Sequence, residues 1–128
     1  MSVNRIILVG NLGRDPRSFG DEDDGTTKVT RLSVATDRVW KDDAGDRQQA
    51  TDWHPVVAFG PMAELAAQLQ KGDPVAIEGR GQTRRFEKDG EAVYAYEIVT
   101  QALTPPSRLG GAKTAPRPED DPQADAEA

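Results

Sequence analysis

Six segments of regular residue pattern, five typical of β-strands and one of a helix, fill residues 6–103 of this 128-residue chain. Residues 6–9 form a short apolar run, and residues 28–40 alternate around Leu32, Val34 and Thr36. An apolar side chain at every second position is the pattern of a strand with one buried face. The predicted strands are residues 6–9, 28–40, 51–59, 74–86 and 91–103.

The strand predicted for residues 51–59 presents two different faces. Trp53, Val57 and Phe59 share one face at a period of two, and His54 belongs to the other. His54 is therefore expected to point away from any surface that the two aromatic residues form. Further along, Asp89 and Gly90 separate the last two strands and predict a tight hairpin turn.

The single helix is predicted for residues 61–70, between the third and fourth strands. Pro61 suits the first turn of a helix, because its missing N–H would have no helical partner there. Apolar residues then recur at the helical period, at Met62, Leu65, Ala66 and Leu69. Gly72 stands where a helix C-cap is expected.

This order of elements predicts an all-β protein with an OB fold, a five-stranded Greek-key barrel with one short helix between strands 3 and 4. Residues 1–104 are predicted to form this domain. Residues 105–128 contain prolines, glycines and acidic residues with Leu109 as the only large apolar side chain. We expect this segment to be a disordered tail, because it cannot bury enough surface to offset its ordering entropy. The fold alone leaves the ligand open.

The composition argues against several classes of protein. Cysteine is absent and His54 is the only histidine, so disulfides, thiolate metal sites and thiol catalysis are excluded. We therefore expect no metal, no cofactor and no catalytic residues. The chain has no apolar run of the ~20 residues that span a membrane. The expected location is the cytoplasm, in association with the nucleoid.

The net charge of −6 is unevenly distributed along the chain. Nine of the 22 acidic residues lie in two segments, 21–24 and 118–128. Elsewhere 16 basic residues stand against 13 acidic ones, so a basic surface is compatible with an acidic chain.

Aromatic residues next to basic ones are the first functional signal. Trp40 lies between Arg38 and Lys41, and Phe86 directly follows Arg84 and Arg85. Proteins that bind single strands need flat rings on which bases stack, beside cations for the phosphates. The alternative is that strand tryptophans fill the core and that the charged run is a solvated face. The pattern by itself leaves both interpretations open.

Two other motifs have simpler explanations than catalysis. Residues 10–13 (GNLG) lack the Lys-Ser/Thr of a phosphate-binding loop and predict a turn. Residues 21–24 (DEDD) suggest a metal-dependent nuclease, but ligands for catalytic cations normally converge from separate elements. Four consecutive acids between glycines predict a solvated loop, and we do not expect an enzyme.

Several ordered motifs together resemble the bacterial single-stranded-DNA-binding proteins. The first is the opening segment, and the others follow at the separations found in that family. The matching segments are residues 3–16 (VNRIILVGNLGRDP), 51–60 (TDWHPVVAFG), 71–72 (KG), 77–80 (IEGR) and 82–84 (QTR). The resemblance covers residues 3 to about 102, nearly the whole region predicted to be ordered.

The resemblance implies an OB-fold homotetramer that wraps single-stranded DNA in replication, recombination and repair. It assigns base stacking to four aromatic residues: Trp40, Trp53, Phe59 and Phe86. It assigns nucleic-acid contacts also to six basic residues: Arg5, Arg38, Lys41, Lys71, Arg84 and Arg85. His54 occupies the position that supports subunit association in the family.

The chain departs from the family pattern at several positions. Phe86 replaces what is frequently a tryptophan, and Asp43 and Pro61 stand where some relatives carry lysine. The tail is acidic but ends PQADAEA and lacks the Pro-Phe tip through which family members recruit replication and repair proteins. The main alternative function is a primosome-type OB adaptor that chiefly binds proteins, and the less favoured one is the metal-dependent nuclease.

Overall fold

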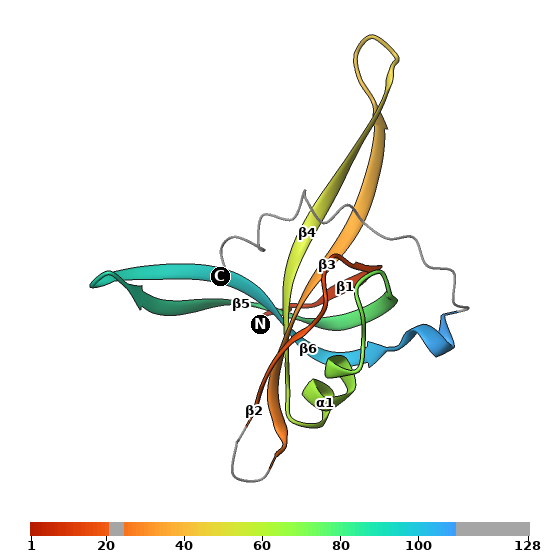
Figure 1. Ribbon diagram of the computed structural model, residues 1–128. Helices are drawn as coiled ribbons and strands as arrows, with labels where there is room; N and C mark the ends of the chain where they lie inside the picture. Colours follow the sequence, from red (N-terminus) through yellow and green to blue (C-terminus); the bar gives the residue numbers. More distant parts are fainter. Residues whose placement is uncertain (21–24, 110–128) are drawn as a thin grey trace.

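The computed structural model describes residues 1–20 and 25–109. They form six strands, one α-helix and a final 3₁₀ turn (Figure 1). The strands are β1 (Ile6–Leu12), β2 (Arg17–Gly20), β3 (Thr27–Lys41), β4 (Arg47–Phe59), β5 (Pro74–Lys88) and β6 (Glu91–Thr104). The helix is α1 (Pro61–Ala67), and the 3₁₀ turn is η1 (Pro106–Arg108).

The strands form one sheet that closes into a barrel. Its order is β1-β5-β6-β4-β3-β2, and β1 also pairs with β3. The closing contact is short, with Asn11 opposite Ala35 and Leu12 opposite Val34. Five strands therefore enclose the core, with α1 between β4 and β5 in the chain. The predicted all-β OB fold is confirmed.

The core lies inside this barrel and is covered at one end by the helix. Leu12, Leu32, Val34 and Ile77 are almost completely buried. Ala66 and Leu69, from α1 and the segment after it, join the same apolar cluster. These inward side chains recur at every second position of their strands. The core therefore lies on the face that the alternation in the sequence predicted.

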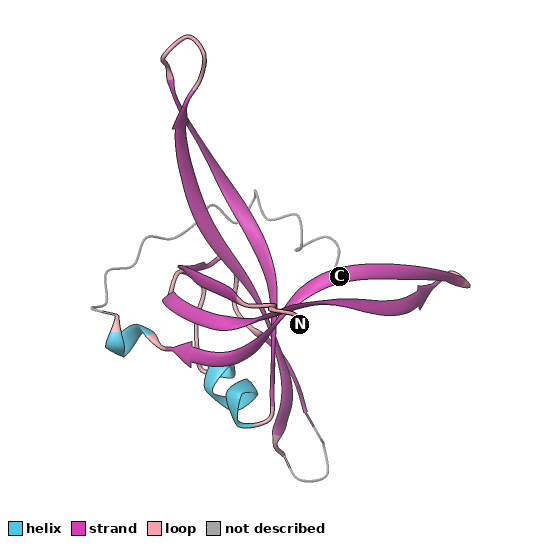
Figure 2. Cartoon of the chain, turned by 180° about the vertical axis from the view of Figure 1, so that it is seen from behind, coloured by secondary structure: helices cyan, strands magenta, loops and turns pink. Residues whose placement is uncertain are grey.

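Two long hairpins leave the barrel in different directions, as Figures 1 and 2 show. We call them the β3–β4 arm and the β5–β6 arm. The first continues its pairing as far as Lys41 opposite Arg47, and the second as far as Lys88 opposite Glu91. The β5–β6 arm ends at Asp89 and Gly90, both with positive φ, as the predicted tight turn requires.

Three local predictions were wrong. Residues 10–13 were predicted to form a turn, but residues 10–12 continue strand β1, and their backbone pairs with β5 and β3. Strand β2 was not predicted, because its four residues are all exposed and show no alternation. The helix ends at Ala67, three residues earlier than expected, and Gly72 is not its C-cap. The backbone N–H of Gln70 donates to the Asp73 carboxylate (2.8 Å) instead of continuing the helix. Gly72, at a φ of 90°, instead forms the buried turn into β5 and donates to the Leu12 carbonyl (2.8 Å).

No helix among the described residues is long and apolar enough to cross a membrane. The acidic segment 21–24 and the tail beyond residue 109 lie outside the described residues.

Candidate nucleic-acid interface

The strand register brings parts of four strands onto the face of the sheet that points away from the barrel core. Arg31 of β3 lies opposite Val57 of β4, which aligns with Val99 of β6, which in turn lies opposite Arg80 of β5. Residues paired across strands share a face of the sheet. We call this surface the outer face. It also includes Trp53, Phe59, Gln82, Arg84, Phe86 and Glu97.

Three rings on the outer face belong to residues predicted to stack, and a fourth is Phe19 of β2, which lies opposite Val29 and is 49% exposed. Phe59 is 49% exposed, and Trp53 and Phe86 are half-buried. The Trp53 ring lies against Gly13, since a Cβ atom placed on Gly13 would come 2.1 Å from Cζ3 of the indole. The Arg84 guanidinium stands 4.8 Å from the centre of the Phe86 ring. None of the three rings is sealed inside the barrel, so each offers surface on which a flat ligand can stack.

A buried carboxylate lies between two of the arginines of the outer face, Arg31 and Arg84. Glu97 is 3% exposed and belongs to β6. Its Oε2 accepts a hydrogen bond from Arg31 Nη1 (3.0 Å) and lies 3.5 Å from Arg84 Nε. Its Oε1 accepts a hydrogen bond from Gln82 Nε2 (3.0 Å). Strands β3, β5 and β6 are thus joined by one ionic cluster, and its Arg84 also lies beside the Phe86 ring.

Trp40 lies on the other side of its arm from Trp53. Trp40 is opposite Gln48 and Trp53 is opposite Ala35, so the two rings belong to alternate faces of the β3–β4 ribbon. The Arg38 guanidinium stands 5.0 Å from the centre of the Trp40 ring and is also hydrogen-bonded to Asp52 (2.8 Å). The predicted aromatic residues therefore do not form a single flat platform.

The remaining predicted cations are dispersed. Arg85 lies on the face of the β5–β6 arm opposite to that of Arg84, across from Tyr94. Lys41 is exposed near the tip of the β3–β4 arm, and Lys71 is exposed in the turn after α1. Arg5 precedes β1 and forms an ion pair with Glu78. The structure thus brings Arg84 to Phe86 and Arg38 to Trp40, and it places Arg5 beside Glu78.

His54 points away from the outer face, as its position in the strand predicted. It lies opposite Val34, on the face of β4 that includes the core residues. Its Nε2 is 2.8 Å from Thr36 Oγ1 in the same chain. Burial lowers the pKa of His54 below its usual value, and the nearby Asp52 carboxylate opposes this shift.

The sequence did not single out Arg31, Gln82 or Glu97. Arg31 and Glu97 are 66 positions apart in the chain. They meet only because β4 pairs with β3 on one side and, in parallel, with β6 on the other. A signal for Arg31 was present, since its odd position in β3 separates it from the core residues Leu32 and Val34. Nothing in a single sequence indicates that a buried acid would face it.

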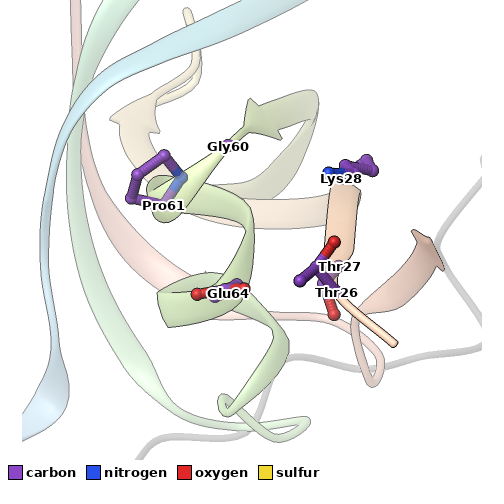
Figure 3. Close-up of a pocket in the computed structure, with 6 residues that line it drawn as sticks. All are labelled: Thr26, Thr27, Lys28, Gly60, Pro61 and Glu64. Atoms are coloured by element: carbon purple, nitrogen blue, oxygen red, sulfur yellow. The ribbon is translucent and has the colours of Figure 1, made fainter. Parts of the chain in front are cut away.

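A cavity of about 200 Å³ lies between the start of α1 and the start of β3 (Figure 3). Thr27, Lys28, Pro61 and Glu64 contribute to its lining, and none of the predicted contact residues does. Within residues 1–20 and 25–109, no group of three acidic or histidine side chains is arranged to hold a metal ion.

These features define the class of protein. A five-stranded barrel of this order, with one helix between β4 and β5, is an OB fold, which is widely used to bind oligonucleotides and oligosaccharides. Rings that lie beside guanidinium groups are the surface chemistry of the OB domains that bind single strands.

The chain belongs to the Single-strand binding protein family, which matches residues 3–105. It is similar to a solved structure described as a Plasmodium falciparum SSB complex with ssDNA, with a TM-score of 0.70 and 27% sequence identity over 81% of this chain and 95% of that chain. It is also similar to a deletion mutant of the single-stranded DNA binding protein from Thermus aquaticus, with a TM-score of 0.68 and 27% identity. That similarity covers 80% of this chain and 50% of the other.

Proposed function

We propose that this protein binds single-stranded DNA with little dependence on base sequence. The observation that carries the proposal is the pairing of an arginine with an exposed or half-exposed ring on each arm, Arg38 with Trp40 and Arg84 with Phe86. A ring with a flanking cation offers a stacking surface to any base and a charge to the neighbouring phosphate.

The mechanism is an equilibrium without a chemical step. Bases stack on Trp40, Trp53, Phe59 and Phe86, and each stack contributes about 1–3 kcal/mol. The proposed cations replace counterions condensed on the phosphates, so affinity falls as salt rises. They are Arg5, Arg38, Lys41, Lys71, Arg84 and Arg85. Duplex DNA binds poorly, because its bases are already stacked on one another.

We further propose that four chains assemble into a homotetramer. On β1, Ile7 and Val9 are 62% and 67% exposed, an apolar surface that water disfavours. Among the described residues, β1 pairs with β3 only at Asn11 and Leu12, so residues 6–9 leave backbone groups on that edge available for another strand. His54 supports this association through its contact with Thr36. Joining several barrels raises the effective concentration of binding sites along one DNA strand.

The biological role that follows is protection of single strands in replication, recombination and repair, in the cytoplasm at the nucleoid. A protein with this role stabilises an exposed strand and releases it to other enzymes, which requires many moderate contacts rather than one very tight one.

Titration with oligo(dT) tests the proposal, because Trp40 and Trp53 are the only tryptophans and both are proposed stacking residues. We expect their fluorescence to be quenched on binding and the affinity to fall steeply as salt rises. A duplex of equal length serves as the control. Unchanged emission with oligo(dT), or equal affinity for the duplex, would contradict the proposal.

A further inference from the structure

The ionic cluster of the outer face contains three charges but has a net charge of only +1. Arg31 and Arg84 carry positive charges, and Glu97 lies between them with a side chain that is 4% exposed. The Arg31 side chain is 23% exposed and the Arg84 side chain 41% exposed, so part of each arginine reaches the surface, although Arg84 Nε is itself buried. The cluster thus offers two guanidinium groups to a ligand. The single negative charge of Glu97 offsets one of their two positive charges.

Glu97 also constrains where the two guanidinium groups can lie. Arg31 reaches it from β3 across the width of β4 and donates to Oε2 (3.0 Å). Arg84 Nε is 3.5 Å from the same oxygen and makes no hydrogen bond to any described residue. The Arg84 guanidinium is therefore held by charge between Glu97 and the Phe86 ring, which is 4.8 Å away. Gln82 donates to Oε1 and fixes the orientation of the carboxylate.

A buried carboxylate in the middle of this surface disfavours phosphate groups there. A phosphate over the cluster would gain two guanidinium contacts but would face Glu97 at short range in a medium of reduced dielectric. A base is uncharged, and it can stack on a guanidinium plane as it does on a ring. Cations without such a partner lie elsewhere: the Lys41 and Lys71 side chains form no ion pair with any described residue.

We propose that Glu97 is a positioning residue of the outer face: it holds Arg31 and Arg84 as stacking surfaces for bases and leaves the sugar-phosphate chain to cations elsewhere on the protein, such as Lys41 and Lys71. This inference rests on the proposed binding of single-stranded DNA and refines it, because it takes Arg84 out of the set of phosphate contacts. It also adds Arg31 and Glu97 to the residues that shape the site.

The test measures how affinity for a short oligo(dT) depends on salt in the parent and in Glu97→Gln. An oligomer of about eight nucleotides is used, within the ~4–16 that one OB barrel accommodates. The neutral amide keeps the shape of the side chain but releases the charge of Arg84, which then contacts phosphate. We expect the slope of log K against log [salt] to become steeper by about 0.7, the value for one additional phosphate contact on a single strand.

A matched control separates this effect from net charge. Glu87→Gln removes one negative charge from an exposed residue on the opposite face of β5, and it should leave the slope unchanged. Lys71→Gln should make the slope shallower by about 0.7. An unchanged slope in Glu97→Gln with uniformly weaker binding would mean that Glu97 only supports the fold, and the inference would be wrong. A parent that fails to bind oligo(dT) would instead reject the proposed function itself.

A second variant covers the case in which Glu97→Gln does not fold. Arg31→Met together with Glu97→Gln replaces the shorter ion pair by neutral groups, an exchange that proteins often tolerate. Arg84 is again released, so the steeper slope is expected here too. A slope equal to that of the parent in this folded double variant would overturn the inference.

Discussion

The two arms carry the same local motif in different surroundings. Each has an arginine beside an aromatic ring, at 5.0 Å for Arg38 and Trp40 and at 4.8 Å for Arg84 and Phe86. On the β3–β4 arm the acidic partner of the arginine is Asp52, whose side chain is 43% exposed. On the β5–β6 arm it is Glu97, whose side chain is 4% exposed.

This difference shows that the burial of the acid determines how firmly an ion pair holds its arginine. Around Asp52, water and salt screen the interaction, so Arg38 gains little from it and can turn towards a ligand. Around Glu97, the carboxylate has lost its water and depends on its protein partners. An arginine, an aromatic ring and an acid thus give an adaptable contact on the β3–β4 arm and a preorganised contact on the β5–β6 arm.

The largest expected difference between the arms is in stability. Glu97→Ala leaves Arg31 without its buried partner and should lower the free energy of unfolding by about 3 kcal/mol. Asp52→Ala breaks an exposed pair and should lower it by less than about 1 kcal/mol. Urea denaturation at one fixed protein concentration measures both. Equal losses would show that the burial of Glu97 has no energetic consequence.

The next difference is in DNA affinity. Phe86→Ala and Trp40→Ala each remove a proposed stack and should weaken binding of oligo(dT) by about 1–3 kcal/mol. We expect the greater loss at Phe86, because Glu97 holds its arginine in place before DNA arrives and less ordering is required on binding. Equilibrium titration of the two variants at the same salt concentration decides the order. A greater loss for Trp40→Ala would reverse our comparison of the arms.

A smaller loss of DNA affinity is expected from changing a glycine that contacts an aromatic ring. Gly13 contacts the Trp53 ring of β4, and Gly81 of β5 contacts Tyr96. Gly13→Ala places a methyl group against the Trp53 ring and should displace it, weakening oligo(dT) binding by about 1 kcal/mol, part of the value of one stack. Gly81→Ala is the control on the β5–β6 arm. There the new Cβ would meet the hydroxyl of Tyr96 at 1.5 Å, but this side chain is 57% exposed and can swing into solvent. Equal affinities of the two variants would argue against a role for the Trp53 ring position.

The smallest expected effect concerns His54, where the β3–β4 arm joins the barrel. Its pKa in the folded protein is lowered by burial, so the unfolded chain binds a proton more readily. The stability that His54 contributes is therefore complete above about pH 6.5 and declines as the pH falls towards the lowered folded value. The free energy of unfolding should decrease between pH 7 and pH 5.5, and His54→Gln should flatten this decrease. An identical pH profile in the variant would exclude His54 as its source.

Much of the candidate site followed from strand periodicity. The alternation in residues 51–59 predicted that Trp53 and Phe59 share a face and that His54 faces away, and the register of β3 against β4 agrees. The Asp89–Gly90 turn was readable because only a few residues tolerate the positive φ values found there. In contrast, Arg84 and Arg85 appeared as one basic cluster in the sequence, although they lie on opposite faces of β5.

The sequence by itself determined the number and order of the barrel strands, the place of the helix and the faces on which the aromatic residues of one strand lie. These are local properties, because a strand alternates and a turn bends for reasons contained in neighbouring residues. The tertiary structure alone decided that Glu97 lies between Arg31 and Arg84, since this contact requires β3, β4, β6 and β5 to be packed in register. The burial of that carboxylate is a property of the assembled sheet. It makes Arg84 a preorganised contact, whereas Arg38, beside an exposed acid, remains adaptable.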